Sequence, residues 1–198
     1  MNSHLPVLNL VCAAIAYPDM SVKTTFEFGC GDYSTAFFAD HSREHYAVDV
    51  TGHEYESRSI EWFKKTALKY AEIDHVDVSL TDHAGTIKKM FDVRPDIVFV
   101  DGAINRPDCV NAAFKSTAKA IVCHDTEETG YAWEEVEAPH GWTQLTRGNL
   151  TIPDVNGAWT TVWTHIPWVA AVLTAAGLNP YLIPRNKNAN LKYLNGGY

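Results

Sequence analysis

Four acidic side chains stand at or just after the ends of short apolar runs. They are Glu27, Asp49, Asp82 and Asp101. If these runs are neighbouring parallel strands, their carboxyl ends meet at one edge of the sheet, which is where open α/β sheets bind ligands. A solvent-exposed loop explains any one of these acids, but it explains all four poorly. We therefore expect the four carboxylates to face a single binding crevice.

A glycine-rich turn, Glu27-Phe28-Gly29-Cys30-Gly31, follows the first of these runs. Gly29 and Gly31 have no Cβ atom, so the backbone can turn sharply and a ligand can approach it closely. A helix that begins near Ser34 would add free N–H groups at its N-terminus. A tight strand-to-helix turn is the purely structural alternative. Ser34 also stands where a dinucleotide fingerprint has its third glycine, which disfavours an NAD site.

A second group of side chains that could do chemistry consists of Asp101 and the pair His124-Asp125. Each follows an apolar run, and the two runs are expected to be consecutive strands of a parallel sheet, so the side chains should lie side by side. His124 could act as a general base and remove the proton of a bound alcohol or phenol. Alternatively, Asp101 and Asp125 could hold a divalent cation that lowers the pKa of that hydroxyl group. A structural histidine that bonds the adjoining loop is the third possibility.

Two further pairs of residues lie in loops close to these groups. Asn105 and Arg106 follow Asp101 and could orient an anionic or sugar substrate, with a solvated position of Arg106 at the surface as the nearly equal alternative. Tyr131 and Trp133 are the aromatic residues best placed to form walls of an acceptor pocket. The other aromatic residues of the C-terminal third are expected to pack in the core.

Apolar runs and helical patterns alternate along the chain. Strands are expected at 24–28, 45–50, 76–80, 96–100 and 120–123, with helices at 34–39, 59–71, 84–91 and 108–119. This alternation predicts a mostly parallel sheet covered by helices on both faces. Two later runs, 142–146 and 158–164, are expected to pair as a hairpin, and a helix at 168–176 should end at Gly177. We therefore expect a single-domain, doubly wound α/β fold with about seven strands, the last of them antiparallel.

The ends of the chain differ from its middle. Residues 7–16 form an apolar run after Pro6, which suits a buried helix better than a signal peptide because no Lys or Arg precedes it. The last segment is rich in Asn, Gly and Lys and is expected to be a flexible tail. The predicted divisions are an N-terminal helix at 1–22, the main domain at 23–185 and the tail at 186–198.

Composition restricts the partners. The formal net charge of −8 and the scattered Lys and Arg residues disfavour a nucleic-acid substrate. No run reaches the roughly 18 apolar residues of a membrane span, so no membrane partner is expected. The four cysteines include no C-x-x-C pair. They are expected to be reduced thiols, which favours a cytoplasmic protein.

The sequence resembles the class I S-adenosylmethionine-dependent methyltransferases from about residue 24 to residue 164. The segments that carry the resemblance are 26–35 (FEFGCGDYST), 46–49 (YAVD), 96–102 (DIVFVDG) and 121–126 (IVCHDT). The endings Asp101-Gly102 and His124-Asp125 are most similar to a branch that methylates hydroxyls of small molecules or sugars. The chain departs from the family at 116–119, where a Gly-Gly pair is common.

The resemblance implies an S-adenosylmethionine site in the predicted crevice. Glu27 and the backbone of Gly29 and Gly31 would hold the methionine part. Asp49 would bind the ribose, unless Glu54 or Glu56 does so. Asp82 and His83 would flank the adenine. The complete implied set is Glu27, Gly29, Cys30, Gly31, Ser34, Asp49, Asp82, His83 and Asp101.

The implied reaction is methyl transfer to a hydroxyl of a small molecule or glycan. Asp101, His124 and Asp125 would be the catalytic residues, and the same three could bind Mg²⁺ or Mn²⁺. Gly102 and the residues after it do not form the Asn/Asp-Pro-Pro-aromatic motif of the base-amino methylating enzymes. A non-catalytic S-adenosylmethionine-binding module of the same fold is the main alternative, and an NAD-dependent oxidoreductase is a weaker one.

Overall fold

A computed structural model describes residues 4–17, 21–50, 56–102, 105–126, 129–147 and 159–180 of the chain. The predicted tail at 186–198 and Glu54 lie outside these residues. Glu56 begins a helix, but its side chain is not among those described.

Seven strands form one sheet in the order β3-β2-β1-β4-β5-β7-β6. All neighbouring pairs from β3 to β5 are parallel, whereas β7 is antiparallel to both β5 and β6. The predicted seven-stranded sheet and its antiparallel last strand are therefore confirmed. The strands are β1 (Val22–Phe28), β2 (Ser42–Val50), β3 (Val76–Thr81), β4 (Ile97–Val100), β5 (Ala120–His124), β6 (Thr143–Arg147) and β7 (Thr160–Thr164).

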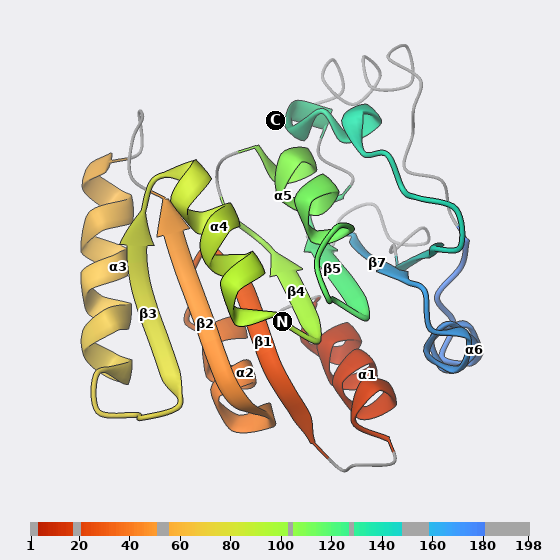
Figure 1. Ribbon diagram of the computed structural model, residues 1–198, viewed down its shortest axis with the longest axis horizontal. Coiled ribbons are helices and arrows are strands. Elements are labelled where there is room, and N and C mark those ends of the chain that lie inside the picture. Colours follow the sequence, from red (N-terminus) through yellow and green to blue (C-terminus); the bar gives the residue numbers. More distant parts are fainter. Residues whose placement is uncertain are drawn as a thin grey trace, which may run out of the picture.

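Helices cover both faces of this sheet. Strand β4 shows why, because all four of its side chains are fully buried and alternate between two apolar cores. The core containing Phe99 also holds side chains from α1 (Leu5–Ala16), α2 (Ser34–His41) and α6 (Pro167–Ala175). The core containing Val98 holds side chains from α4 (His83–Val93), α5 (Arg106–Ala113) and the short 3₁₀ helix η2 (Trp133–Glu135). Helix α3 (Glu56–Tyr70) lies along the edge strand β3 (Figure 1).

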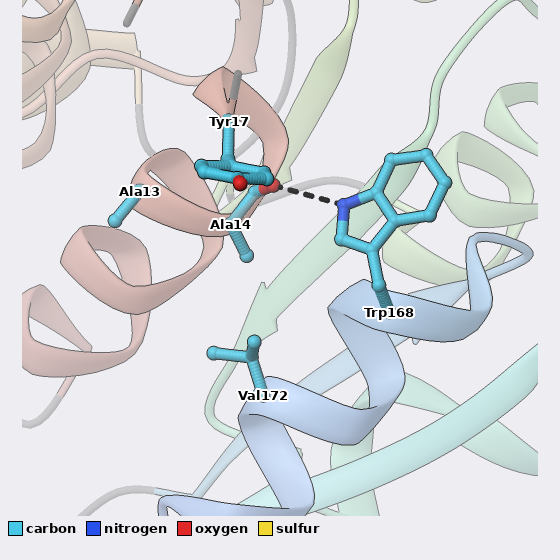
Figure 2. Close-up of a pocket in the computed structure, with 5 residues that line it drawn as sticks. All are labelled: Ala13, Ala14, Tyr17, Trp168 and Val172. Atoms are coloured by element: carbon cyan, nitrogen blue, oxygen red, sulfur yellow. Dashed lines mark hydrogen bonds between the residues drawn. The ribbon is translucent and has the colours of Figure 1, made fainter.

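The N-terminal apolar run forms α1, whose Val7, Leu8 and Val11 are fully buried. Its partner in the same layer is α6, and the two helices are joined by a hydrogen bond from Trp168 Nε1 to the carbonyl oxygen of Ala14 at 3.1 Å (Figure 2). That carbonyl lies in the last turn of α1, where backbone acceptors have no partner within the helix. Helix α1 is thus part of the main core.

Helix α5 differs from its predicted extent. It begins at Arg106, next to a proline that suits the first turn of a helix, and it ends at Ala113 rather than near residue 119. Beyond it the Ser116 hydroxyl donates to the Ala113 carbonyl at 2.7 Å and accepts from the Ala118 N–H, so these groups bond within a turn and not within a continued helix. Phe114 and Ala118 are buried in the core beyond the helix, which is why the apolar pattern continues.

Among the helices that the structure describes, none has both the length and the apolar character needed to cross a lipid bilayer.

Candidate active site

The carboxyl ends of β3, β2, β1, β4 and β5 meet at one edge of the sheet, toward which the arrowheads of β2 and β3 point in Figure 1. Register places Phe28 of β1 beside Val48 of β2 and Val100 of β4, and Val100 beside Cys123 of β5. The predicted acids and His124 therefore follow the same edge in the order Asp82, Asp49, Glu27, Asp101, His124.

Glu27 is buried in the protein rather than exposed to the predicted crevice. It is 1% exposed, and its carboxylate accepts hydrogen bonds from the hydroxyls of Ser34 and, at 2.8 Å, Thr35 in the first turn of α2. The Nε2 atom of His45, from β2, lies 3.3 Å from Oε2 of the same carboxylate. Glu27 and Ser34 therefore fasten the start of α2 to the central strands, and they shape the turn between them.

The two glycines of that turn have different roles. Gly29 has a φ of +101°, and a Cβ atom added to it would lie 3.0 Å from Cα of Gly102 in the loop after β4. Only glycine fits there, because an L side chain is disfavoured by that φ and would meet backbone. Gly31 has no such constraint, since a Cβ atom there would meet only the hydroxyl oxygen of Ser34, at 3.1 Å. Its N–H donates to Thr35 Oγ1 at 2.9 Å.

Asp49 lies next to this turn at the end of β2. Its Oδ1 accepts from the N–H of Val50 at 2.9 Å, and the Cys30 thiol donates to Oδ2 at 3.7 Å. Burial raises the pKa of Asp49, and these two hydrogen bonds oppose the rise. Burial and the charges of Asp49 and Glu27 raise the pKa of the Cys30 thiol, so Cys30 acts as a protonated donor and not as a nucleophile.

Asp82 and His83 stand at the start of α4. Asp82 is its N-cap, with Oδ1 accepting from the N–H of Gly85 at 2.6 Å. His83 Nε2 lies 2.6 Å from Oδ2 of Asp108, which joins α4 to the first turn of α5. Both residues, which are predicted to flank the adenine, thus also hold the start of α4 in place.

Arg106 is buried, with 4% of its surface exposed, so its interpretation as a solvated surface residue is wrong. Its Nε donates to the carbonyl of Gly102 at 2.8 Å, and its Nη1 donates to the carbonyl of His124 at 2.7 Å. The guanidinium also stacks 3.9 Å from the ring centre of Tyr131. One side chain therefore joins the loops after β4 and β5, because its planar fork donates in several directions at once.

The same guanidinium lies between two carboxylates. Its Nη2 is 3.3 Å from Oδ1 of Asp101, and its Nη1 is 3.4 Å from Oδ2 of Asp125. Asp125 has a φ of +56°, a conformation that is uncommon outside glycine. The guanidinium of Arg106 thus occupies the position between the two aspartates where a cation was predicted.

His124 faces both carboxylates through one nitrogen. Its Nδ1 lies 3.3 Å from Oδ1 of Asp101 and 3.3 Å from Oδ1 of Asp125. Burial by itself lowers the pKa of His124, and Arg106 acts in the same direction. The hydrogen bond and charge of Asp101 and the charge of Asp125 outweigh both, so the pKa is raised above its ordinary value of 6.5. The structure thus brings together the three predicted residues Asp101, His124 and Asp125.

A histidine that sequence reasoning missed completes this cluster. His4, just before α1, is 5% exposed, and its ring meets that of His124 edge-on with 4.5 Å between centroids. Burial and the nearby His124 lower the pKa of His4 to about 4, with Asp101 opposing, so its imidazole is neutral at pH 7. Nothing in the sequence marks His4, because it is a lone histidine, and the residues that it contacts in space, Phe99 and His124, lie far from it along the chain.

Tyr131 and Trp133, the two aromatic residues predicted to line a pocket, lie in different environments. Trp133 is 4% exposed and belongs to the core between α5 and the sheet, so its prediction as a pocket wall is wrong. Tyr131, in the 3₁₀ helix η1 (Thr129–Tyr131), lies on the guanidinium of Arg106 at the edge of the cluster. The ring of Trp133 lies 6.0 Å from that of the half-buried Tyr131 and packs in the core beneath it.

The sheet order and the helices on both faces define the Rossmann-like methyltransferase fold. No family model and no curated protein matches the sequence. Among solved structures, the chain is similar to the O-methyltransferase TomG from Streptomyces achromogenes in complex with SAM. The TM-score is 0.52 at 17% identity, with 79% of this chain and 78% of TomG covered.

Other proteins of this fold act on different molecules. An rRNA methylase from Streptococcus thermophilus matches with a TM-score of 0.56 at 12% identity, covering 83% of this chain and 96% of that one. Spermidine synthase from Thermotoga maritima matches at 0.50 and 13% identity, covering 78% of this chain. The chain spans only 55% of that synthase and 59% of a second spermidine synthase structure. The fold therefore leaves the acceptor open, and the expectation that nucleic acid is excluded has no support from these neighbours.

We expect Arg106→Met to destabilise the protein by about 3 kcal/mol, because it leaves two partly buried carboxylates without their cation. Arg106→Lys should recover only part of this, since an ammonium lacks the planar fork. Urea unfolding measures the difference. Arg43→Met is the matched control, because Arg43 is exposed, and it should change stability by less than about 0.5 kcal/mol. Equal stability of the Arg106→Met and Arg43→Met variants would show that Arg106 does not hold the site together.

Proposed function

We propose that this protein is an S-adenosylmethionine-dependent methyltransferase that acts on a hydroxyl of a small molecule or glycan. The observation that supports this best is the cluster of Asp101, His124 and Asp125 on Arg106, beside the glycine turn after β1. The net charge of −8 favours a small acceptor over a nucleic acid. Four cysteines in the thiol form fit a reducing compartment, and we place the protein in the cytoplasm.

Several residues along the carboxyl edge of the sheet support the proposed cofactor site. The backbone from Gly29 to Gly31 is bare of large side chains, and the half-buried carboxylate of Asp49 beside it suits a ribose diol. Asp82 and His83 would stand at the adenine end. Glu27 and Ser34 would act indirectly, by fixing the turn. When bound, S-adenosylmethionine supplies an electrophilic methyl group on a sulfonium.

His124 would remove the proton of the acceptor hydroxyl. An ionised carboxylate only accepts hydrogen bonds, so the contact from Asp101 to Nδ1 puts the proton of the neutral ring on Nδ1. Nε2 then carries the lone pair that takes the acceptor proton. Asp101 and Asp125 hold the ring in place and stabilise the imidazolium that forms. Since the positive charge of Arg106 already lies between the two aspartates, we assign this step to His124 rather than to Mg²⁺ or Mn²⁺ at that position.

Calorimetry with S-adenosylhomocysteine tests the cofactor site. We expect micromolar affinity and no competition by NAD. Asp49→Ala should weaken binding about 10- to 150-fold, because it removes a charge-assisted hydrogen bond of about 1.5–3 kcal/mol. Asp49→Asn, which keeps an acceptor oxygen, should lose less. If Asp49→Ala binds like the parent protein, the ribose ligand is elsewhere, and Glu54 and Glu56 are the next residues to change.

Gly31→Val tests whether the turn itself contacts the cofactor. A Cβ atom at Gly31 would meet no backbone and only the hydroxyl oxygen of Ser34, at 3.1 Å, and we expect the variant to fold and yet fail to bind S-adenosylhomocysteine. Gly29 is unsuitable for this test, because a side chain there meets the backbone of Gly102. Gly130→Val is the control, since a Cβ atom at Gly130 meets nothing within 4 Å. A folded Gly31→Val variant with normal affinity would mean that the turn is structural only.

The protonation of His124 tests the proposed base. We expect NMR titration of the protein in EDTA to give His124 a pKa above 6.5, as Asp101 and Asp125 raise it against burial and Arg106. The base form is then populated only above that pKa, so kcat/KM should rise with pH through it. In Asp101→Asn, the NMR titration of His124 and the rise of kcat/KM should both move to lower pH. The substitution removes the hydrogen bond and the charge that raise the pKa of His124.

Activity is measured as release of S-adenosylhomocysteine with a panel of phenols, catechols and sugars. His124→Ala should lower the rate by about 100- to 10,000-fold and abolish the acidic limb of the profile. An unchanged limb in His124→Ala would assign the base elsewhere. Tight cofactor binding without turnover on any acceptor would instead favour the non-catalytic module.

A further inference from the structure

We propose that His4, Asp101 and His124 form a binding site for a divalent transition-metal ion of the zinc type. The site lies where the start of α1 meets the carboxyl ends of β4 and β5. One nitrogen of each histidine and one carboxylate oxygen of Asp101 all lie within 4.8 Å of one another. The proposal goes beyond methyl transfer, since it concerns an ion and a histidine that the proposed reaction does not use.

The strongest support is the state of His4. Its side chain is 5% exposed, and neither ring nitrogen has a hydrogen-bond partner among the described residues. Buried polar atoms almost always have a partner, and each exception calls for an explanation such as an ion. The ring of His4 is held against His124 and Phe99, with centroids 4.5 Å and 5.4 Å away. An ion bound between His4 and His124 would satisfy a nitrogen of each.

The donor set selects the kind of ion. Two imidazoles and one carboxylate suit Zn²⁺ and Co²⁺, whereas Mg²⁺ prefers oxygen ligands. Metal–nitrogen distances are about 2.0–2.1 Å, so the three ligand atoms need to move together by only about an ångström. Three protein ligands leave one tetrahedral position open for water or another small ligand.

Neighbouring side chains also hold two of the three proposed ligands in place. Asp125 Oδ1 lies 3.3 Å from His124 Nδ1, so a carboxylate outside the proposed ligand set helps to hold the ring of His124 in place. Arg106 lies 3.3 Å from Oδ1 of Asp101 and fixes that ligand. This site differs from the one expected between Asp101 and Asp125, because it uses His4 and leaves Arg106 in place. An ion here would occupy the His124 lone pair, so the loaded protein would not use His124 as a base.

Metal binding by the full chain, after EDTA treatment and dialysis, tests the proposal. Titration with Co²⁺, followed by its visible absorption, and calorimetry with Zn²⁺ should each give one ion per chain. His4→Ala and His4→Gln should weaken binding at least about 100-fold. Zn²⁺ should raise the melting temperature of the parent but not of the His4 variants. Circular dichroism checks that the variants are folded, and His4→Gln keeps a polar side chain of similar length in case the smaller residue fails to fold.

His140→Ala is the matched control, because His140 is an exposed histidine outside the cluster, and it should bind the ions like the parent. Equal affinity in the parent and in a folded His4 variant would overturn the proposal, as would equal loss in His140→Ala. Loss in Asp125→Asn but not in His4→Gln would overturn it in favour of a two-aspartate site. S-adenosylhomocysteine binding should be unchanged in His4→Gln. If the cofactor fails to bind the parent, the methyltransferase proposal fails and the ion titration still decides the metal site.

Discussion

The structure at the carboxyl edge of the sheet depends on one buried charge. The guanidinium of Arg106 holds the carbonyls of Gly102 and His124 and lies between Asp101 and Asp125. A buried guanidinium must be paired, and the two partly buried carboxylates supply its counter-charges, so each group fixes the position of the other. The orientation of His124 follows, because the two carboxylates around its Nδ1 are the ones that Arg106 anchors. Removing this cation would leave the loops after β4 and β5 without their common support.

The other half of the edge is built from close backbone contact and from one buried carboxylate. Gly29 and Gly102 approach so closely that a Cβ atom at either would meet backbone at 3.0 Å. Glu27, turned inward, holds the start of α2 through two hydroxyls. The acids along this edge therefore divide into two kinds. Glu27 and Asp82 accept hydrogen bonds from the first turns of α2 and α4, whereas Asp49 contacts the glycine turn and Asp101 contacts Arg106 and His124.

Helix α1 links the core to the site. Its apolar side chains pack with α2 and α6 on one face of the sheet, and this packing sets His4 against His124. The position of His4 thus depends on apolar contacts along a whole helix and on the Trp168 hydrogen bond near its far end. A residue at the N-terminal end of α1 therefore reaches a site otherwise built from the ends of β4 and β5.

The sequence by itself determined the sheet and the edge where the acids gather. Continuous apolar runs such as 97–100 specify strands buried on both faces, and acids that end successive parallel strands must share an edge. Only the tertiary structure decided which side chains turn inward. The burial of Arg106 and Glu27, the core position of Trp133 and the arrival of His4 all depend on packing between segments distant in the chain. Local periodicity carries no information about such contacts, because it reports which face of an element is apolar and not what covers it.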